Sequence, residues 1–282
     1  MNKLSICLCS LFLALTLRAE TGVNKDRILL GQSAALSGAS QALGKNLWLG
    51  AQAYFDKINE QGGVHGRKIE VITRDDAYEG DKALVNTINL VKKDEVFALF
   101  GYVGTPTMVR TLPALRKLNK DEDIFLFGNF TGAQPQRGDP YKDYVFNIRP
   151  SYREETKGLV DHLVQLGHKK IGLFIQFDSY GRSGADGVRA ALKSHNLQVV
   201  EETTYVRGAQ IDKNMADQVK RLMASGASAV IAIGSYEAST AFIRESRSRG
   251  YNAVIANVSF VNLNIPRSLV TASNNDSDSL AN

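Results

Sequence analysis

Short apolar segments alternate with amphipathic helical segments along most of the chain, and this alternation limits the folds that the chain can adopt. The helical segments repeat apolar residues at helical spacing, as at Leu84, Val85, Ile88 and Val91. Candidate strands, short and apolar as strands buried on both faces are, lie at Ile28–Leu30, Ile69–Ile72, Val96–Phe100, Ile124–Phe127, Ile171–Phe177, near Val199, Ala229–Ile233 and Ala253–Ala256. This β-α-β-α order predicts an α/β fold of doubly wound parallel sheets.

The alternation pauses between Thr131 and Pro150, a stretch rich in Gly, Pro, Asp and Tyr. We interpret this pause as the passage between two lobes. Lobe one is expected at residues 20–147 and an incomplete lobe two at residues 148–267. Residues 268–282 are polar, rich in Ser and Asn and weakly periodic, so they are expected to form a loose tail.

The N-terminus has the pattern of an export signal, predicted at residues 1–19. A basic residue precedes an uncharged run from Leu4 to Leu17, and Ala19 offers a cleavage point. The run is shorter than the roughly 20 apolar residues of a spanning helix. An uncleaved anchor is the alternative, because Leu17 is larger than the residue usual at that position of a cleavage site. Both cysteines, Cys7 and Cys9, lie inside this segment, so the mature chain would have no disulfide.

Composition and motifs argue against several classes of function. A formal net charge of +5 is mild and spread along the chain, which disfavours a nucleic-acid partner. The segment Gly38–Lys45 resembles a phosphate-binding loop, but its glycine spacing is wrong and Asn46 replaces the Ser or Thr. Asp75 and Asp76 have no third ligand at metal-binding spacing. We therefore expect no cofactor and no metal, and an enzyme only as a minor alternative.

The loop Gly101–Thr107 follows a predicted strand and opens a helix. Thr105 is expected at the N-cap and Pro106 in the first helical turn. Free backbone N–H groups and the helix dipole favour a negative charge there, and the loop contains no Lys or Arg. The loop therefore predicts a site that holds a small anion, such as a carboxylate, by neutral hydrogen bonds. A plain helix cap is the alternative.

Asn129 and Thr131 follow the next strand of the same predicted sheet. Because the carboxyl ends of parallel strands meet at one edge, both side chains are expected near Thr105. The alternative is turn chemistry beside Gly128 and Gly132.

Two tyrosines follow strands of the predicted second lobe at equivalent loops. Tyr180 precedes a helix expected to begin near Gly184, and Tyr236 follows the strand Ala229–Ile233. Tyrosines at equivalent strand ends are expected to line a small-molecule pocket. Incidental exposure is the alternative for each tyrosine alone.

Several stretches, in this order, are similar to those of a known family. They are Ala35–Gly38, Asn59–Lys68 followed by Arg74-Asp75-Asp76, Tyr180-Gly181 and Gly234-Ser235-Tyr236. The Asn59–Lys68 run is the most specific. With these stretches the chain resembles, over about residues 27–261, the periplasmic solute-binding proteins of the leucine/isoleucine/valine type, which have the type I periplasmic-binding fold.

The resemblance implies a receptor of an ABC importer that performs no chemistry. Two lobes would close on a small ligand in the periplasm, and the protein, expected to be a monomer, would deliver that ligand to an inner-membrane permease. Thr105 and Thr131 would hold a carboxylate with help from a backbone group of Asn129, and Tyr180 and Tyr236 would line lobe two. A sensor partnered with a membrane signalling enzyme is the alternative, since it would use the same fold.

Departures from the family pattern affect the expected ligand and the expected stability. Ser259 stands where amino-acid-binding relatives place an acidic residue, and Leu43 replaces an aromatic residue that often touches the ligand. A neutral hydroxyl cannot neutralise a buried ammonium, so a carboxylate is expected while amino acids, other acids and amides stay open. The resemblance fades after Val261, where the family normally continues. We therefore expect a shortened chain with marginal stability and weakened ligand binding.

Overall fold

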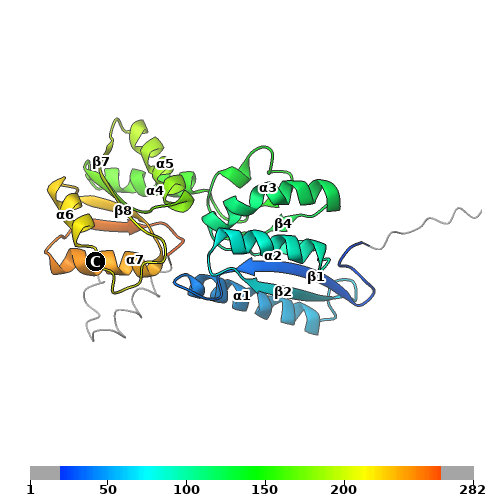
Figure 1. Cartoon of the computed structure of the whole chain (residues 1–282). Helices are drawn as coiled ribbons and strands as arrows, with labels where there is room; N and C mark the ends of the chain where they lie inside the picture. The colour runs from blue at the N-terminus through cyan, green and yellow to red at the C-terminus, as the bar shows by residue number, and fades with distance from the viewer. Residues whose placement is uncertain (1–19, 262–282) are drawn as a thin grey trace, which may run out of the picture.

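The computed structural model describes residues 20–261. The predicted signal at 1–19 and the predicted tail at 268–282 lie outside these residues. Within the described part, the chain forms two α/β lobes, each built on its own parallel sheet (Figure 1). The chain crosses from the first to the second between the last strand of the first sheet and the helix that begins at Tyr152.

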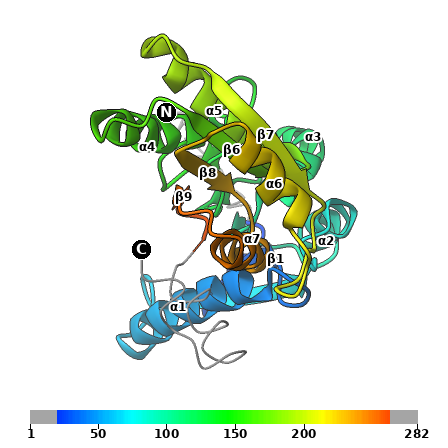
Figure 2. The same cartoon turned by 90° about the vertical axis from the view of Figure 1, so that its left-hand side faces the viewer.

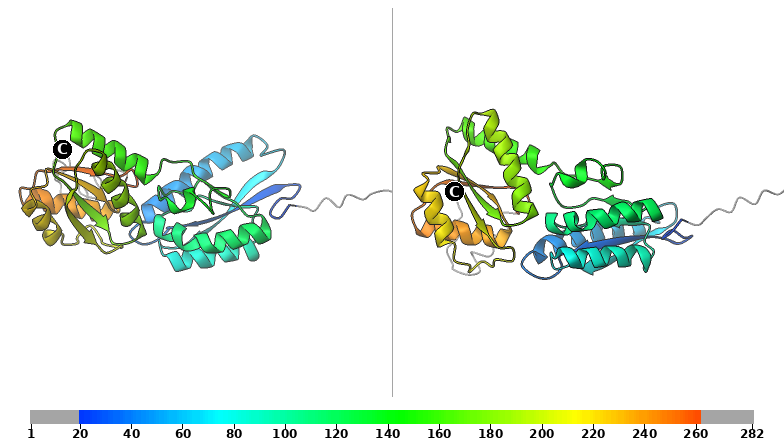
Figure 3. Two further views of the ribbon diagram at one scale, coloured as in Figure 1. Left: turned by 90° about the horizontal axis from the view of Figure 1, so that it is seen from above. Right: turned by 45° about the horizontal axis from the view of Figure 1, so that its top comes forward.

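The first sheet has the strand order β2-β1-β3-β4-β5 within the described residues, and all its pairings are parallel. Helix α1 lies on one side of this sheet and α2 and α3 on the other, as the view from above shows (Figure 3). The elements are β1 (Arg27–Ala34), α1 (Gln41–Glu60), β2 (Lys68–Asp75), α2 (Gly80–Lys92), β3 (Ala98–Phe100), α3 (Thr105–Glu122), β4 (Leu126–Phe127), the short 3-10 helix η1 (Pro135–Arg137) and β5 (Val145–Phe146).

The second sheet has the order β7-β6-β8-β9 within residues 20–261, again all parallel. Helices α4 and α5 cover one face and α6 and α7 the other (Figure 2). The elements are α4 (Tyr152–Gln165), β6 (Ile171–Gln176), α5 (Ser179–Ser194), β7 (Val199–Tyr205), α6 (Ala216–Ala224), β8 (Ala229–Ile233), α7 (Tyr236–Ser248) and β9 (Val254–Asn257). The doubly wound α/β prediction is confirmed.

The strands that the sequence placed best are those buried along their whole length. Every residue of β6 and β8 is buried, and these two strands pair with each other at the centre of the second sheet. Strand β5 was missed, because its two residues lie inside the segment rich in Gly, Pro and Tyr. That segment was interpreted as a passage between lobes, yet it first contributes an edge strand to the first sheet.

The predicted start of α5 near Gly184 is wrong, since the helix begins at Ser179. The Asp178 carboxylate accepts hydrogen bonds from the backbone N–H groups of Tyr180 and Gly181, at 2.9 and 3.4 Å, and so caps the helix. Gly181 is part of this first turn because the helix runs close against the preceding strand. A Cβ atom there would lie 1.9 Å from the carbonyl oxygen of Gln176.

Each lobe has its own apolar core, and a further apolar cluster joins the two lobes. The joining cluster includes Tyr78 and Val103 from the first lobe and Tyr152, Tyr180 and Phe260 from the second part of the chain. These five residues lie in loops and first helical turns that follow the carboxyl ends of strands, while other members of the cluster belong to β6, β8, α4 and α5 of the second lobe. The strand ends of the two sheets therefore face each other, as the β1 arrow pointing toward the second lobe shows (Figure 1).

None of the helices within residues 20–261 combines the length and the apolar character needed to span a bilayer.

Candidate site between the two lobes

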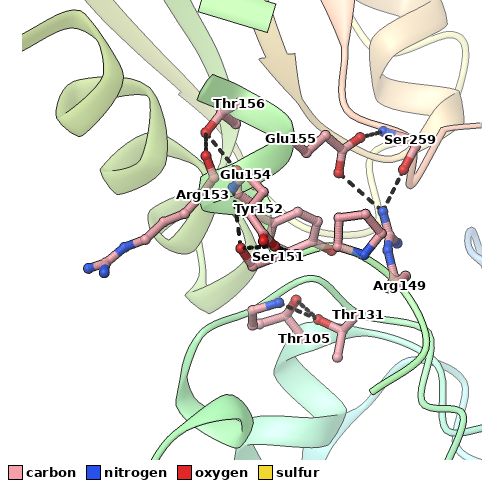
Figure 4. Close-up of polar contacts among 12 residues, drawn as sticks. Thr105, Thr131, Arg149, Ser151, Tyr152, Arg153, Glu154, Glu155, Thr156 and Ser259 are labelled. Carbon is pink, nitrogen blue, oxygen red and sulfur yellow. Dashed lines mark hydrogen bonds and ion pairs between the residues drawn. The ribbon is translucent and has the colours of Figure 1, made fainter. Parts of the chain in front are cut away.

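Thr105 and Thr131 lie together at the edge of the first lobe. Their hydroxyl oxygens are 2.6 Å apart, and both residues are buried. The Thr131 oxygen also accepts a hydrogen bond from the Ala133 N–H group at 3.2 Å. Whichever threonine donates in the Thr105–Thr131 hydrogen bond, the other hydroxyl hydrogen is not used by that bond. The pair is therefore a preformed donor site at the start of α3 (Figure 4).

The predicted N-cap role of Thr105 is wrong by one position. Gly104 is the N-cap, and Thr105 is the first residue of α3, followed by Pro106. Gly104 has φ of 102°, and a Cβ atom there would lie 2.0 Å from the ring of Tyr78. Glycine therefore takes the cap because the Tyr78 ring packs against the backbone. The Thr105 hydroxyl is consequently directed to Thr131 instead of capping the helix.

Asn129 is buried beside this pair, but its side chain turns away from it. Its amide nitrogen donates to the Asn147 side-chain oxygen at 3.2 Å, whereas its Oδ1 has no hydrogen-bond partner. Its backbone carbonyl accepts from the Thr131 N–H group at 3.1 Å. Asn129 thus fixes the loop that carries Thr131.

The sequence predicts Tyr180 and Tyr236 in loops between a strand and a helix, whereas the structure places both inside helices. Each lies in the first turn of a helix, α5 or α7, and each is buried. The Tyr180 hydroxyl donates to the Gly234 carbonyl at 3.3 Å. The Tyr236 hydroxyl accepts from the Ala42 N–H group of the first lobe at 3.4 Å. Both tyrosines line the junction of the lobes, and Tyr236 bridges it directly.

The structure adds aromatic residues that the sequence interpretation missed. Phe260 is 1% exposed and packs on Phe130 and Tyr180, with ring centroids 5.3 and 4.9 Å away. Tyr152 packs on Tyr180 at 5.4 Å. Tyr152 follows Ser151, whose side chain forms a capping box with Glu154, a signal that the sequence does contain. Phe260 lies beyond the last predicted strand, in a segment without periodicity.

Within the described residues 20–261, two hydroxyl groups at this junction are buried without hydrogen-bond partners, those of Tyr78 and Tyr152. Buried polar groups in native proteins are nearly always paired. Burial raises the pKa of the Tyr152 phenol, while Arg149, Thr105 and Thr131 oppose that rise. The phenol is therefore a neutral donor at physiological pH, and it adds a second unused donor close to the threonine pair.

Arg149 and Glu155 surround Ser259, the residue that departs from the family pattern. Arg149 lies 3.2 Å from the Glu155 carboxylate and donates to the Ser259 hydroxyl at 2.5 Å, and the Ser259 N–H group donates to Glu155 (Figure 4). The Arg149 guanidinium also lies over the Phe130 ring, 4.9 Å from its centroid. Glu155 thus brings a carboxylate to Ser259, but its charge is balanced by Arg149.

A further ion pair joins the lobes away from the threonines. Arg207, between β7 and α6, lies 3.0 Å from the Glu79 carboxylate of the first lobe and 3.9 Å from Asp178 of its own lobe. Its guanidinium also lies 5.8 Å from the centroid of the Tyr78 ring. These contacts, with the Ala42–Tyr236 hydrogen bond, connect the second lobe to the starts of α1 and α2.

Among residues 20–261, no group of three or more His, Cys, Asp or Glu side chains is placed to hold a metal ion.

Comparison with known proteins places the chain in a family. The sequence profile of a family described as "Periplasmic binding protein" matches residues 28–272. The chain belongs to the periplasmic binding protein family. The resemblance to its leucine/isoleucine/valine type is confirmed by relatives in sequence and in structure.

The relatives are binding proteins and not enzymes by name. An "Amino acid binding protein" of Pseudomonas aeruginosa is 28% identical over 80% of this chain and 59% of its own length. A "Leu/Ile/Val-binding protein homolog 8" of Brucella suis is 26% identical over 86% of this chain and 60% of its own. The chain of this periplasmic binding protein thus spans about three fifths of the length of these curated relatives.

Solved structures of the family have the same fold. A possible leucine/isoleucine/valine-binding protein from Rhodopirellula baltica is 33% identical, with a TM-score of 0.77 over 88% of this chain and 66% of that one. A substrate-binding periplasmic protein from Ralstonia solanacearum is 29% identical, with a TM-score of 0.78 over 86% and 66%. The two-lobed type I periplasmic-binding architecture is thereby established for the described part of the chain.

Proposed function

We propose that this protein is the solute-binding component of an ABC importer, and that it holds a small carboxylate-bearing compound between its lobes. The observation that carries the proposal is the Thr105–Thr131 pair at the start of α3, 2.6 Å between hydroxyl oxygens. A carboxylate placed there accepts the spare hydroxyl hydrogen and faces the positive end of the α3 dipole. The names of the relatives support an amino acid or a related acid as the solute.

The surrounding residues each have a part in this proposal. Asn129 holds the Thr131 loop in place, and Tyr152 offers an unused phenol hydrogen beside the pair. Tyr180 and Tyr236 form the wall of the second lobe. Phe260 packs between Phe130 and Tyr180, so a solute that enters either packs against this ring or displaces it.

Closure in this mechanism is a movement of one lobe against the other. Opening breaks the Arg207–Glu79 ion pair and the Ala42–Tyr236 hydrogen bond, and it exposes the aromatic rings between the lobes. The ion pair and the hydrogen bond form again when the lobes close on the solute. The closed form is then presented to a membrane permease, and the export signal at residues 1–19 brings the protein to the periplasm as a monomer.

The test is a melting-temperature screen of the purified chain against amino acids and small organic acids. A ligand at 100 times its Kd adds about 2.7 kcal/mol to the free energy of unfolding. The proposal expects at least one acid to stabilise the protein and its amide to do so less. If no compound of the panel shifts the melting temperature, the proposed function is wrong.

Thr105→Val tests the donor site within the same experiment. Loss of a hydrogen bond to a charged ligand is expected to weaken binding by about 10- to 100-fold. Thr111→Val is the matched control, because Thr111 is a buried threonine of the same helix whose hydroxyl bonds only the Met108 carbonyl, at 2.8 Å. Equal effects of the two substitutions on acid binding would count against Thr105 as a ligand residue.

A further inference from the structure

A second space lies between the lobes, next to Thr105. It is a cavity of about 290 Å³. Its walls come from α3 and the η1 segment of the first lobe and from α4 and α5 of the second. The lining residues used below are Thr105, Gln134, Arg153, Ser179, Arg182 and Asp186.

Two helices begin at this cavity, one from each lobe. Thr105 is the first residue of α3 and Ser179 the first of α5, and both line the space. Each helix is long enough to carry a full dipole, with its positive end at these residues. Asp178 caps the next two amide groups of α5, and its carboxylate lies 3.9 Å from Arg207. The cavity therefore receives the positive end of α3, whereas the Asp178 carboxylate offsets the positive end of α5.

Two arginines add full charges to the same walls. Arg153 and Arg182 are exposed, and neither forms an ion pair with any residue between 20 and 261. Asp186 is the acidic residue of the lining, and its carboxylate lies 3.0 Å from Arg189, a residue that also pairs with Glu202. Gln134 contributes a side-chain amide whose buried Oε1 has no hydrogen-bond partner. The lining thus has an excess of positive charge and an unused polar group.

Figure 4 shows how this cavity relates to the threonine pair. Arg153 extends from α4 on the side opposite Arg149 and Ser259, with Thr105 and Thr131 below. Thr105 belongs to both the threonine pair and the cavity: its hydroxyl is hydrogen-bonded to that of Thr131, and Thr105 also lines the cavity. The cavity and the threonine pair are therefore adjacent at Thr105.

We propose that the solute carries two acid groups and that this cavity binds the second one. This inference rests on the proposed function, because it assigns the first carboxylate to Thr105 and Thr131. The second carboxylate interacts with Arg153 and Arg182, which come from the second lobe, so a dicarboxylic acid connects the two lobes through its two ends. The charge pattern at the other side of the site agrees with this solute, since the Glu155 carboxylate is engaged by Arg149 and is therefore not free to pair with a ligand ammonium.

Matched acids of equal length test the proposal on the full chain by calorimetry. Glutarate is compared with pentanoate and adipate with hexanoate, so that each pair differs by a carboxylate in place of a methyl group. We expect the dicarboxylate of at least one pair to bind about tenfold or more tightly, as charge-assisted hydrogen bonds of arginine would provide.

The arginines are tested by the double substitution Arg153→Gln and Arg182→Gln. It should reduce the preference for the dicarboxylate to less than about threefold and change monocarboxylate binding little. Arg116→Gln is the matched control, because Arg116 is an exposed arginine on α3 about 16 Å along the helix from Thr105. Melting of the ligand-free variants verifies that all are folded.

The outcomes separate this inference from the function on which it rests. If monocarboxylates bind and the second carboxylate brings no gain, the inference is wrong and the proposed function stands. The same holds if the gain survives the double substitution. If no acid of either kind binds, both the inference and the proposed function are wrong.

Discussion

Gly104 allows the ring of Tyr78 to reach the start of α3, and through that contact it positions the threonine pair. Its φ of 102° is a conformation that side chains rarely adopt, and a Cβ atom would lie 2.0 Å from the ring. Gly62 has nearly the same φ, 100°, but beyond its chain neighbours no described residue comes within 4 Å of the position of its Cβ. The two glycines therefore separate backbone strain from steric overlap.

We expect Gly62→Ala to lower the free energy of unfolding by about 1 kcal/mol, from backbone strain alone. Gly104→Ala should cost at least about 1 kcal/mol more, because the Tyr78 ring must also move. Urea denaturation of both variants measures the difference. Equal losses in the free energy of unfolding for the two variants would mean that the Tyr78 ring can move aside at no energetic cost.

Asp76 is a buried carboxyl group whose titration affects stability. It accepts hydrogen bonds from the Ser33 hydroxyl at 2.7 Å and the Tyr78 N–H group at 2.9 Å. Burial raises its pKa from 3.8 to about 6, and the charges of Asp75 and Glu79 act in the same direction. The folded protein therefore holds this proton more tightly than the unfolded chain does.

The sign of the pH effect follows from this difference in proton binding. The contribution of Asp76 is fully present below pH 3.8 and is lost as the pH rises through about 6. Within that window the free energy of unfolding should fall by about 1.4 kcal/mol per pH unit from this group. Subtracting the pH curve of Asp76→Asn from that of the parent isolates the contribution. A difference curve that is flat, or that rises with pH, would contradict the burial of an ionised Asp76.

At the scale of elements, the sequence predicted best what hydrophobic patterning alone determines. Strands β6 and β8 are continuous apolar runs, and a run of that kind can lie only at the centre of a sheet. Strand β5 has two residues, and its pairing with β4 depends on tertiary contacts that no local pattern contains. The predicted starts of α3 and α5 differ from the observed ones. Gly104 and Gly181 allow close packing at these helix starts, and such packing cannot be predicted from a local sequence pattern.

The residues of the candidate site likewise fall into those that the sequence can predict and those that it cannot. Thr105 and Thr131 could be predicted because both follow strands of one parallel sheet, whose carboxyl ends must meet. Phe260 could not, since its position depends on how the chain after β9 packs between the lobes. The burial of Tyr180 and Tyr236 likewise follows from contact between the lobes, which strand and helix patterns do not report.

The aromatic pair on β4 and β5 gives an element-scale prediction. Phe127 and Phe146 stack at 4.8 Å on neighbouring strands, yet remain 42% and 43% exposed. Exposed apolar groups that lie together favour association and dye binding. The double substitution Phe127→Thr and Phe146→Thr should reduce fluorescence of a hydrophobic dye several-fold, whereas Val206→Thr, at a position of the second lobe that is 77% exposed, should change it little. Unchanged dye binding in the double variant would show that this pair is covered in solution.

At the scale of the whole molecule, the ion pair between Arg207 and Glu79 opposes separation of the lobes. It is partly exposed, at 30% and 51%, so its contribution is about 1 kcal/mol or less. Arg207 also keeps its neighbours Asp178 and Tyr78 when Glu79 loses its charge, which limits the effect further. We therefore expect Glu79→Gln to increase the dissociation rate constant of the best-binding acid by up to about fivefold, with a smaller change in the association rate constant.

Asp81→Asn is the control for this prediction, because Asp81 pairs with Arg110 within the first lobe, at 2.7 Å, and does not touch the second. Stopped-flow displacement of bound acid measures the rates for both variants. If the Arg207–Glu79 ion pair must break before the acid is released, the effect of Glu79→Gln on the dissociation rate constant should diminish at high salt. Salt screening already weakens this ion pair in the parent protein. Equal release rates for the parent and Glu79→Gln at low salt would mean that the lobes open without breaking this pair, and that closure depends on the buried rings and the solute alone.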